Sequence, residues 1–198
     1  TDAAEGLQAL SWPLVQVAET RLSLGALAAD WRGRFALPLL AVTGSNGKTT
    51  TKEMIASILK AAYGEAVLAT QGNFNNDIGL PLTLLRLNAT HRAAIIELGM
   101  NHPGEIAYLA GIARPTVALV TNAQRAHLAG MGSLEAIAAE KGSIYTGLDE
   151  TGVAVFNADD PWAKLWRSQC RGLRMMTFGF EQAADVTGKF HLHGLESR

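Results

Sequence analysis

The sequence predicts an α/β fold in which a mostly parallel β-sheet is flanked by helices on both faces. From residue 35 onward, short apolar runs of strand length alternate with longer stretches whose apolar residues recur at helical spacing. One such unit, residues 39–51, places a glycine-rich loop between a strand and a helix. With 198 residues, of which 48% are hydrophobic, the chain is long enough to bury one sizeable core.

Each strand and helix of the predicted sheet follows from this alternation. Short runs rich in Val, Ile, Leu and Ala predict strands at 39–43, 66–70, 93–98, 117–121, 153–157 and 175–178. The stretches between them predict helices at 49–62, 78–87, 104–113, 133–148 and 161–170. In the first helix, the expected apolar face consists of Met54, Ile55, Ile58, Leu59 and Ala62. Because alternation of this kind gives a parallel sheet, ligands are expected beyond the carboxyl ends of its strands.

Residues 1–35 differ in character from the rest of the chain. They contain a short apolar run at 12–17 and a helix-like stretch at 22–31, but no glycine-rich or catalytic pattern. We expect a packing appendage or the tail of a preceding domain, in preference to a separate functional module.

Composition excludes several classes of protein. The 17 Lys and Arg residues nearly balance the 18 Asp and Glu residues, so no basic field indicates nucleic acid binding. The single cysteine, Cys170, excludes an internal disulfide framework. The sequence has no apolar run of membrane-spanning length and no signal-peptide pattern. We therefore expect a cytoplasmic protein without membrane insertion.

The loop between the strand at 39–43 and the following helix has the chemistry of a phosphate-binding site. Gly44 and Gly47 let main-chain N–H groups approach phosphate oxygens, Lys48 supplies a mobile cation, and Thr49 supplies a hydroxyl ligand for magnesium. The full P-loop pattern would have glycine where Val42 stands, so only a compressed form is present. A short match of this kind can also be an ordinary surface turn, but the flanking strand and amphipathic helix favour nucleotide binding.

Polar side chains follow the next two strands of the predicted sheet. The second strand leads into a loop that contains Asn75, Asn76 and Asp77, and the third delivers Glu97 at the end of an apolar run. The loop is either simple turn chemistry or part of the site, since it shares a sheet edge with the phosphate loop. Glu97 is either a surface carboxylate or a buried one, and burial would require a cation such as a metal bound to a nucleotide.

Residues after the fourth and fifth strands are weaker candidates. His127 lies in the loop after the fourth strand, where a lone histidine is often a surface or capping residue. Asn157 and Asp160 follow the fifth strand. They could contact a nucleotide, but for Asp160 we favour capping of the helix that follows.

Lys141 is an unusual residue in the predicted helix 133–148. It lies in the middle of an apolar stripe, so it must either extend to solvent or hold a partner. The stripe consists of Leu134, Ile137, Ile144, Tyr145 and Leu148.

Four segments, in order and at compatible spacings, resemble the Mur ligases, a family of ATP-dependent amide-forming enzymes of bacterial cell-wall synthesis. They are Thr43-Gly-Ser-Asn-Gly-Lys-Thr-Thr50, Gly72-Asn-Phe-Asn-Asn-Asp-Ile-Gly-Leu-Pro81, Glu97-Leu-Gly-Met-Asn-His-Pro-Gly-Glu105, and Ala126-His-Leu-Ala-Gly-Met-Gly-Ser-Leu134 with Ala139-Glu-Lys-Gly142. The family's phosphate loop is compressed in the same way. The resemblance covers nearly all of residues 19–198 and is strongest to the family members that add D-alanyl-D-alanine to UDP-MurNAc-tripeptide.

The resemblance implies a role for each matching residue. It implies that Gly44, Ser45, Asn46, Gly47, Lys48, Thr49 and Thr50 bind the phosphates of ATP, and that Asn157 contacts the nucleotide. It implies two Mg²⁺ sites, with Thr49 and Glu97 at the first and His127 and a carbamylated Lys141 at the second. Lys48, His127 and Lys141 are the implied catalytic residues, and the loop with Asn75, Asn76 and Asp77 is expected near the muramoyl-peptide substrate.

The family also implies a division into domains. Its members have three, so we expect residues 1–35 to be a remnant of the amino-terminal UDP-substrate domain with a linker. Residues 36–198 are then an incomplete central ATP-binding domain with the family's P-loop NTPase-like fold, without the carboxy-terminal domain. Alone, this chain is expected to bind nucleotide weakly or not at all and not to complete ligation. Two alternatives stay open, namely an amide ligase of the folylpolyglutamate synthase type and a nucleotide-binding module without chemistry.

Overall fold

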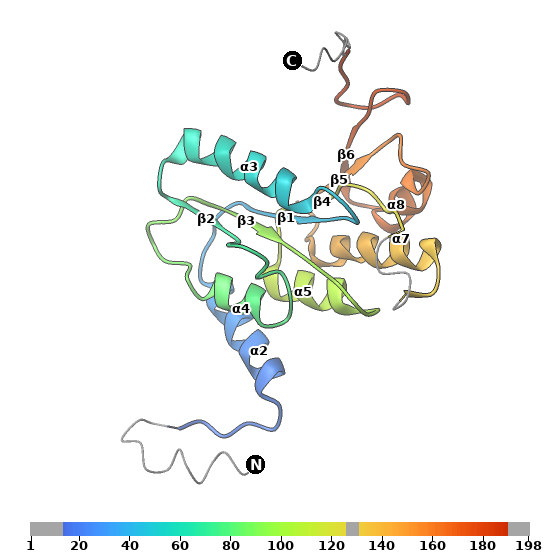
Figure 1. Ribbon diagram of the computed structural model, residues 1–198. Helices are drawn as coiled ribbons and strands as arrows, with labels where there is room; N and C mark the ends of the chain where they lie inside the picture. Colours follow the sequence, from blue (N-terminus) through green and yellow to red (C-terminus); the bar gives the residue numbers. More distant parts are fainter. Residues whose placement is uncertain (1–13, 126–130, 190–198) are drawn as a thin grey trace, which may run out of the picture.

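A six-stranded, wholly parallel β-sheet forms the centre of the molecule (Figure 1). The structure is a computed structural model that describes residues 14–125 and 131–189. The strand order is β2-β3-β1-β4-β5-β6. The strands are β1 (Leu39–Thr43), β2 (Val67–Ala69), β3 (Ala93–Glu97), β4 (Val117–Val120), β5 (Val153–Asn157) and β6 (Arg174–Phe178). The predicted α/β fold with a parallel sheet is therefore confirmed.

The register of the strands brings the candidate residues to one edge of the sheet. Strand β1 lies between β3 and β4, and Val42 near its end pairs with Glu97 of β3 and Leu119 of β4. Because all strands run the same way, the segments after β1, β2, β3 and β4 leave the sheet at the same edge.

Helices cover both faces of the sheet, but unequally. In Figure 1, α3 lies across one face, whereas α2, α4 and α5 lie on the other. The helices are α2 (Thr20–Gly33), α3 (Lys48–Tyr63), α4 (Gly79–Leu84), α5 (Glu105–Ala113), α7 (Leu134–Gly142), the 3₁₀ helix η1 (Ser143–Gly147) and α8 (Ala163–Gln169).

Side chains that alternate along the strands divide the hydrophobic core into two parts. Val42 and Ile95 point toward α3 and form a small cluster with Ala56. Their neighbours Ala41 and Ile96 belong to a larger cluster on the opposite face, which includes residues of α4, α5 and α7. The loop at 44–47 and the start of α3 therefore belong to the face of the sheet that has the smaller apolar cluster.

The apolar face predicted for α3 is wrong in part. Met54 and Ile58 are 64% and 68% exposed, whereas Lys52 and Ala56 are buried. The helix rests on the sheet along a narrow line that runs through positions 52 and 56, with Ile55 beside it. The sequence pattern misses this line because a lysine occupies one of its positions.

The single helix predicted at 133–148 is two elements. Helix α7 ends at Gly142 and continues as the 3₁₀ helix η1. At this junction the hydroxyl of Ser143 donates to the carbonyl of Glu140 at 2.5 Å. A Cβ atom on Gly142 would lie 1.8 Å from the side chain of Gln169, so α8 packs directly against the end of α7.

Helix α2 is bound to the rest of the domain through side chains at its C-terminal end. Trp31 donates its indole N–H to the carbonyl of Leu87 at 2.9 Å. The guanidinium of Arg32 donates to the carbonyls of Ala113 and Arg114 at 3.0 and 3.2 Å, which ties α2 to the end of α5.

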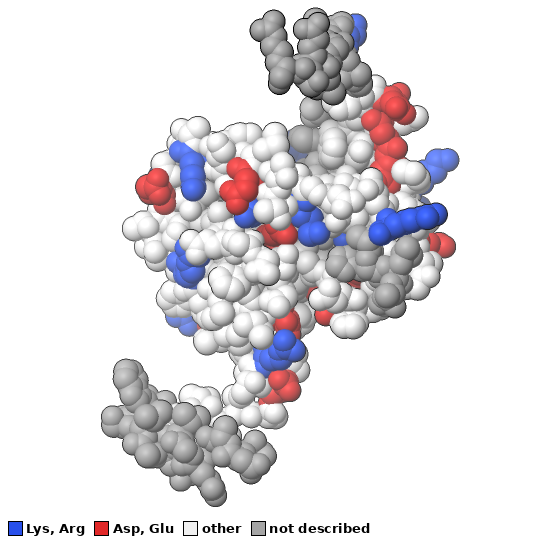
Figure 2. All heavy atoms as spheres, viewed as in Figure 1, with Lys and Arg blue, Asp and Glu red and all other residues white. Residues whose placement is uncertain are grey.

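The surface carries no strong field of one sign on the face that Figure 2 shows, since basic and acidic side chains are interspersed there. This agrees with the nearly balanced charge of the sequence. Across residues 14–125 and 131–189, no helix has both the length and the apolar character that crossing a membrane requires.

Candidate nucleotide and metal site

The loop from Gly44 to Gly47 connects β1 to α3 in a conformation that requires both glycines. Gly44 has a φ of +153°, and a Cβ atom there would lie 1.8 Å from Oγ1 of Thr121. Gly47 has a φ of +77° and precedes the first residue of α3. The N-terminal end of α3 therefore opens toward the space above the loop, with the positive end of its dipole at that point.

The segment after β4 holds the outer side of this loop. The side-chain amide of Asn122 accepts from the main-chain N–H of Asn46 and donates to its carbonyl, both at 3.0 Å. The main-chain N–H of Gln124 donates to the hydroxyl of Ser45 at 2.9 Å. These contacts, which sequence reasoning did not identify, fix the loop and engage the N–H of Asn46 within the protein.

Lys48 folds back over the phosphate loop. Its Nζ donates to the carbonyl of Gly44 at 2.9 Å and lies 3.5 Å from that of Ser45. Burial lowers the pKa of Lys48, and the negative charge of Glu97 partly offsets this effect. The arrangement keeps the ammonium group close to the backbone amides that would bind a phosphate.

Glu97 is the central acceptor of the site. It is 2% exposed, so the alternative of a surface carboxylate does not hold. Its two oxygens accept from the hydroxyl of Thr49 at 2.9 Å and from the side-chain amide of Asn75 at 2.8 Å. A hydroxyl, a carboxylate and an amide within one hydrogen-bonded cluster offer the oxygen ligands that Mg²⁺ prefers.

Lys141 on α7 is 1% exposed, which excludes the alternative that its side chain extends to solvent. Burial, together with the positive charge of Lys48, lowers the pKa of Lys141 from 10.5 to about 7, although Glu140 opposes the shift. The two lysines thus belong to one electrostatic environment although they come from different helices.

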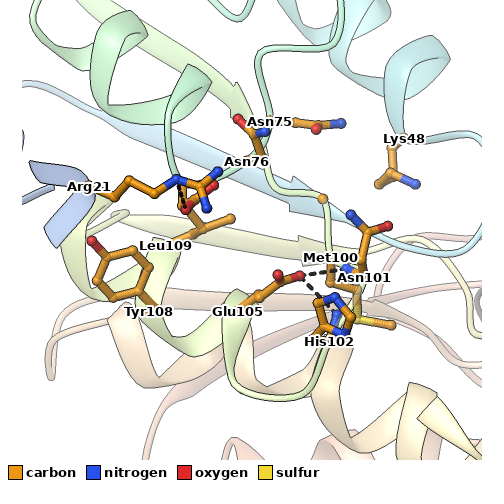
Figure 3. Close-up of a pocket in the computed structure, with 12 residues that line it drawn as sticks. Arg21, Lys48, Asn75, Asn76, Met100, Asn101, His102, Glu105, Tyr108 and Leu109 are labelled. Atoms are coloured by element: carbon orange, nitrogen blue, oxygen red, sulfur yellow. Dashed lines mark hydrogen bonds and ion pairs between the residues drawn. The ribbon is translucent and has the colours of Figure 1, made fainter. Parts of the chain in front are cut away.

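A pocket of about 400 Å³ opens beside Lys48 (Figure 3). Figure 3 shows Lys48 at one end and Arg21 with Tyr108 at the other. Asp77 forms an ion pair with Arg21, in which Oδ2 of Asp77 lies 3.2 Å from Nε of Arg21. The remaining lining residues are Asn75, Asn76, Gly99, Met100, Asn101, His102, Glu105 and Leu109.

The asparagine loop combines both roles that its sequence suggested. Asn76 has turn chemistry, since its side-chain oxygen accepts from the N–H of Gly79 at 2.8 Å. Asn75 instead reaches Glu97, and both asparagines line the pocket. The loop is therefore a folded turn that also forms a wall of the site.

The opposite wall depends on two glutamates that sequence reasoning did not single out. Glu105 accepts from the N–H groups of Asn101 and His102. Glu140 of α7 accepts from the N–H groups of Gly104 and Ile106, both at 2.9 Å, and so caps the start of α5. Glu140 is 36 and 34 residues away from Gly104 and Ile106 in sequence, so no local pattern indicates that it caps α5.

Other predicted residues lie elsewhere. Thr50 is exposed in the first turn of α3. Asn157 ends β5 and accepts from the N–H of Asp159 at 3.0 Å, and it is not among the residues that line the pocket. Asp160 accepts from the N–H of Trp162, capping the turn before α8, and also from that of Ala123. His127 lies outside the described residues.

Comparisons with known proteins assign the chain to a family. Residues 42–197 match the Mur ligase middle domain family. The UDP-N-acetylmuramoyl-tripeptide–D-alanyl-D-alanine ligase of Haemophilus influenzae is 51% identical over 81% of this chain, and that of Escherichia coli is 49% identical over 93%. The chain spans only 35% and 41% of the lengths of these two relatives.

Solved structures show the same relationship. A MurF crystal structure from Acinetobacter baumannii is 40% identical and superimposes with a TM-score of 0.83, over 89% of this chain and 40% of the other. The MurF ligase of Thermotoga maritima in complex with ADP is 34% identical, with a TM-score of 0.77, over 88% and 40% of the two chains. FolC of Escherichia coli, at 18% identity and a TM-score of 0.63, shares the fold alone. The match over residues 42–197 and these identities show that the chain belongs to the Mur ligase family.

Proposed function

We propose that the chain is the ATP-binding part of a ligase that joins D-alanyl-D-alanine to UDP-MurNAc-tripeptide in a bacterial cytoplasm. The observation that carries the proposal is the convergence of Lys48, Thr49 and Glu97 at one sheet edge, beside a pocket of about 400 Å³. The substrates are those in the names of the relatives, to which this chain is 51% and 49% identical over the aligned residues. In this proposal, residues 36–198 form the central domain and residues 1–35 belong to a preceding domain and linker.

The nucleotide would bind with its phosphates over the loop formed by Gly44, Ser45, Asn46 and Gly47 and by the first turn of α3. Main-chain N–H groups and the dipole of α3 favour an anion here, and Lys48 is already held over the loop. Since the N–H groups of Ser45 and Asn46 both donate to Asn122, the amides of Gly47 and of the start of α3, including that of Thr50, would carry most of the phosphate contacts. Asn157 is proposed to contact the nucleotide farther from the phosphates.

A magnesium ion fits the oxygen atoms of Thr49 and Glu97, with Asn75 as a neighbour that orients the carboxylate. When bound, such an ion neutralises phosphate charge and orients the transferred group. For a second ion, the proposed ligands are His127 and a carbamate on Lys141. The low pKa of Lys141 favours this modification, because only the neutral amine can add carbon dioxide and release a proton.

The proposed reaction has two steps. The terminal carboxylate of the tripeptide attacks the γ-phosphorus of ATP, which gives an acyl phosphate and ADP. The amine of D-alanyl-D-alanine then attacks the acyl carbon, an amide forms, and phosphate leaves with loss of a proton. Lys48 would stabilise charge on the transferred phosphoryl group, and the walls that carry Asn75, Asn76 and Asp77 would position the acceptor carboxylate beside it.

The test is a titration of this chain with Mg²⁺ and the non-hydrolysable analogue AMPPNP. Because the chain spans less than half of the length of its relatives, we expect any binding to be weak. We expect Lys48→Ala to abolish this weak binding and Lys60→Ala, which replaces an exposed lysine on the same helix, to leave it unchanged. Folded Lys48→Ala protein that binds as tightly as the unsubstituted chain would contradict the proposed phosphate site.

Ligation requires a separate assay, because the chain spans less than half of the length of these relatives. We expect no ligated product from this chain alone. We expect ATP-dependent product, lost on substitution of Lys48, from a full-length ligase that carries these residues. Product formed by the 198-residue chain itself would overturn the first expectation.

A further inference from the structure

Lys52 is a second fully buried lysine near the site, and none of the roles proposed above uses it. It lies on α3 one turn after Lys48 and is 1% exposed. Its Nζ donates to the main-chain carbonyl of Thr70 at 2.9 Å and lies 2.5 Å from the carboxylate of Glu53, which is 66% exposed. Lysine is rarely buried to this extent unless a partner holds it, so the contact with Thr70 needs an explanation.

Thr70 continues the pairing of β2 with β3 in an unusual way. Its side-chain hydroxyl, instead of its carbonyl, accepts from the main-chain N–H of Glu97 at 3.0 Å. Its own N–H donates to Ile95 at 3.1 Å, as in a regular parallel ladder. The carbonyl of Thr70 is therefore free to turn toward α3, where Lys52 supplies its donor among the described residues.

Together these contacts form a closed ring between α3 and the end of β3. The hydroxyl of Thr49 bonds to the carboxylate of Glu97, and the N–H of Glu97 bonds to the hydroxyl of Thr70. The carbonyl of Thr70 then bonds to Lys52, which returns to α3 three residues after Thr49. The helix thus holds Glu97 at two points, through its side chain and through its main chain.

We propose that Lys52 is a positioning residue for the metal site, which fixes the main chain of Glu97 through Thr70. The inference rests on the proposed function in one respect, namely that Glu97 binds a divalent cation. A cation bound between Thr49 and Glu97 would replace their direct hydrogen bond. The contact through Thr70 would then be the remaining link of the ring that holds Glu97 against α3.

The first arm of the test needs no ligand. In the ¹⁵N-labelled chain, hydrogen exchange of the Glu97 amide is compared with that of Leu119 and Val120 in β4. We expect Lys52→Met to accelerate exchange at Glu97 about tenfold relative to those reference amides, because the acceptor at Thr70 is no longer held. Lys60→Met on the same helix and Glu53→Gln, which removes only the exposed charge partner, should leave the ratio unchanged.

The second arm measures Mn²⁺ binding by electron paramagnetic resonance in the presence of AMPPNP. We expect Lys52→Met to weaken Mn²⁺ binding by roughly tenfold or more, as is typical when a residue that orients a metal ligand is lost. Affinity for AMPPNP without metal should stay within about twofold, since the Nζ of Lys52 bonds to Thr70 and Glu53 and not to the loop at 44–47. A purely structural role would instead lower Tm without changing the metal affinity of the folded protein.

Thr70→Val keeps the test decisive if Lys52→Met does not fold. It cuts the ring on the side of Glu97 and leaves Lys52 and its carbonyl partner in place. Unchanged Mn²⁺ affinity in folded Thr70→Val protein, or unchanged Glu97 exchange in folded Lys52→Met protein, would overturn the proposal. If the unsubstituted chain binds neither AMPPNP nor Mn²⁺, the proposed function fails for this chain, and the exchange measurement still decides whether Lys52 holds Glu97.

Discussion

The hydroxyl of Thr49 and the carboxylate of Glu97 form a hydrogen bond of 2.9 Å across 48 residues of sequence. The contact joins the first turn of α3 to the end of β3, so the phosphate loop and the buried carboxylate form one unit. Both groups are oxygen ligands, and Asn75 occupies the other carboxylate oxygen. The arrangement explains why a carboxylate that is 2% exposed is tolerated at the edge of the sheet.

Glu97→Gln separates the proposed metal-binding role of this carboxylate from its structural role. The amide retains the shape and one acceptor oxygen, and it removes a buried charge, so Tm should change by no more than a few degrees. Mn²⁺ affinity in the presence of AMPPNP should fall by roughly tenfold or more. Glu53→Gln, on the exposed side of α3, is the matched control for loss of charge. Retained Mn²⁺ affinity in Glu97→Gln would rule out Glu97 as a metal ligand.

Gly44→Ala and Gly47→Ala form a second pair of matched variants. At Gly44 the new Cβ would meet Oγ1 of Thr121 at 1.8 Å, whereas at Gly47 no atom lies within 4 Å and only the positive φ is unfavourable. We expect Gly47→Ala to cost about 1 kcal/mol of unfolding free energy and Gly44→Ala at least about 2 kcal/mol. Denaturant titrations measure both.

The clash at Gly44 also predicts that substitutions at Gly44 and Thr121 have non-additive effects on stability. In Gly44→Ala combined with Thr121→Ala, the offending hydroxyl is gone, so the double variant should be more stable than the sum of the single changes implies. Strict additivity would show that the close approach of Gly44 to Thr121 is not what requires the glycine.

The strand pattern and the loop chemistry were predictable because they depend on residues close together in sequence. Strands β1 and β5 begin and end where the sequence predicts. For Lys141, its place in an apolar stripe left open whether the side chain extends to solvent, and the structure decides for burial. The contacts of Asn122 with the loop and of Glu140 with α5 join segments 76 and at least 34 residues apart, and no local pattern indicates them. The buried line of α3 was missed for a related reason, since the burial of Lys52 depends on the distant carbonyl of Thr70, which accepts a hydrogen bond from its Nζ.

Removal of the Glu140 carboxylate should loosen one wall of the pocket. Glu140→Ala leaves the N–H groups of Gly104 and Ile106 without their acceptor, which should cost about 1–3 kcal/mol of unfolding free energy. Hydrogen exchange should accelerate in a peptide that covers residues 101–108. Glu135→Ala in the exposed first turn of the same helix is the control. Equal exchange in the two variants would mean that Glu140 does not hold the start of α5.

Burial of Lys141 should make the stability of the chain depend on pH in a defined direction. The pKa of Lys141 is about 7 in the folded chain against an ordinary value of 10.5, so between these pH values the unfolded state binds more protons. The cost of burying the lysine is therefore largest below pH 7 and fades as pH rises toward about 10. Lys141→Met removes this cost, so it should raise the free energy of unfolding by at most about 5 kcal/mol at pH 6. In buffers free of carbon dioxide, the gain in unfolding free energy of Lys141→Met over the unsubstituted chain should shrink steadily from pH 6 to pH 10. The exposed Lys60→Met should show no such trend, and a gain for Lys141→Met that is the same at every pH would mean that Lys141 keeps an ordinary pKa in the folded protein.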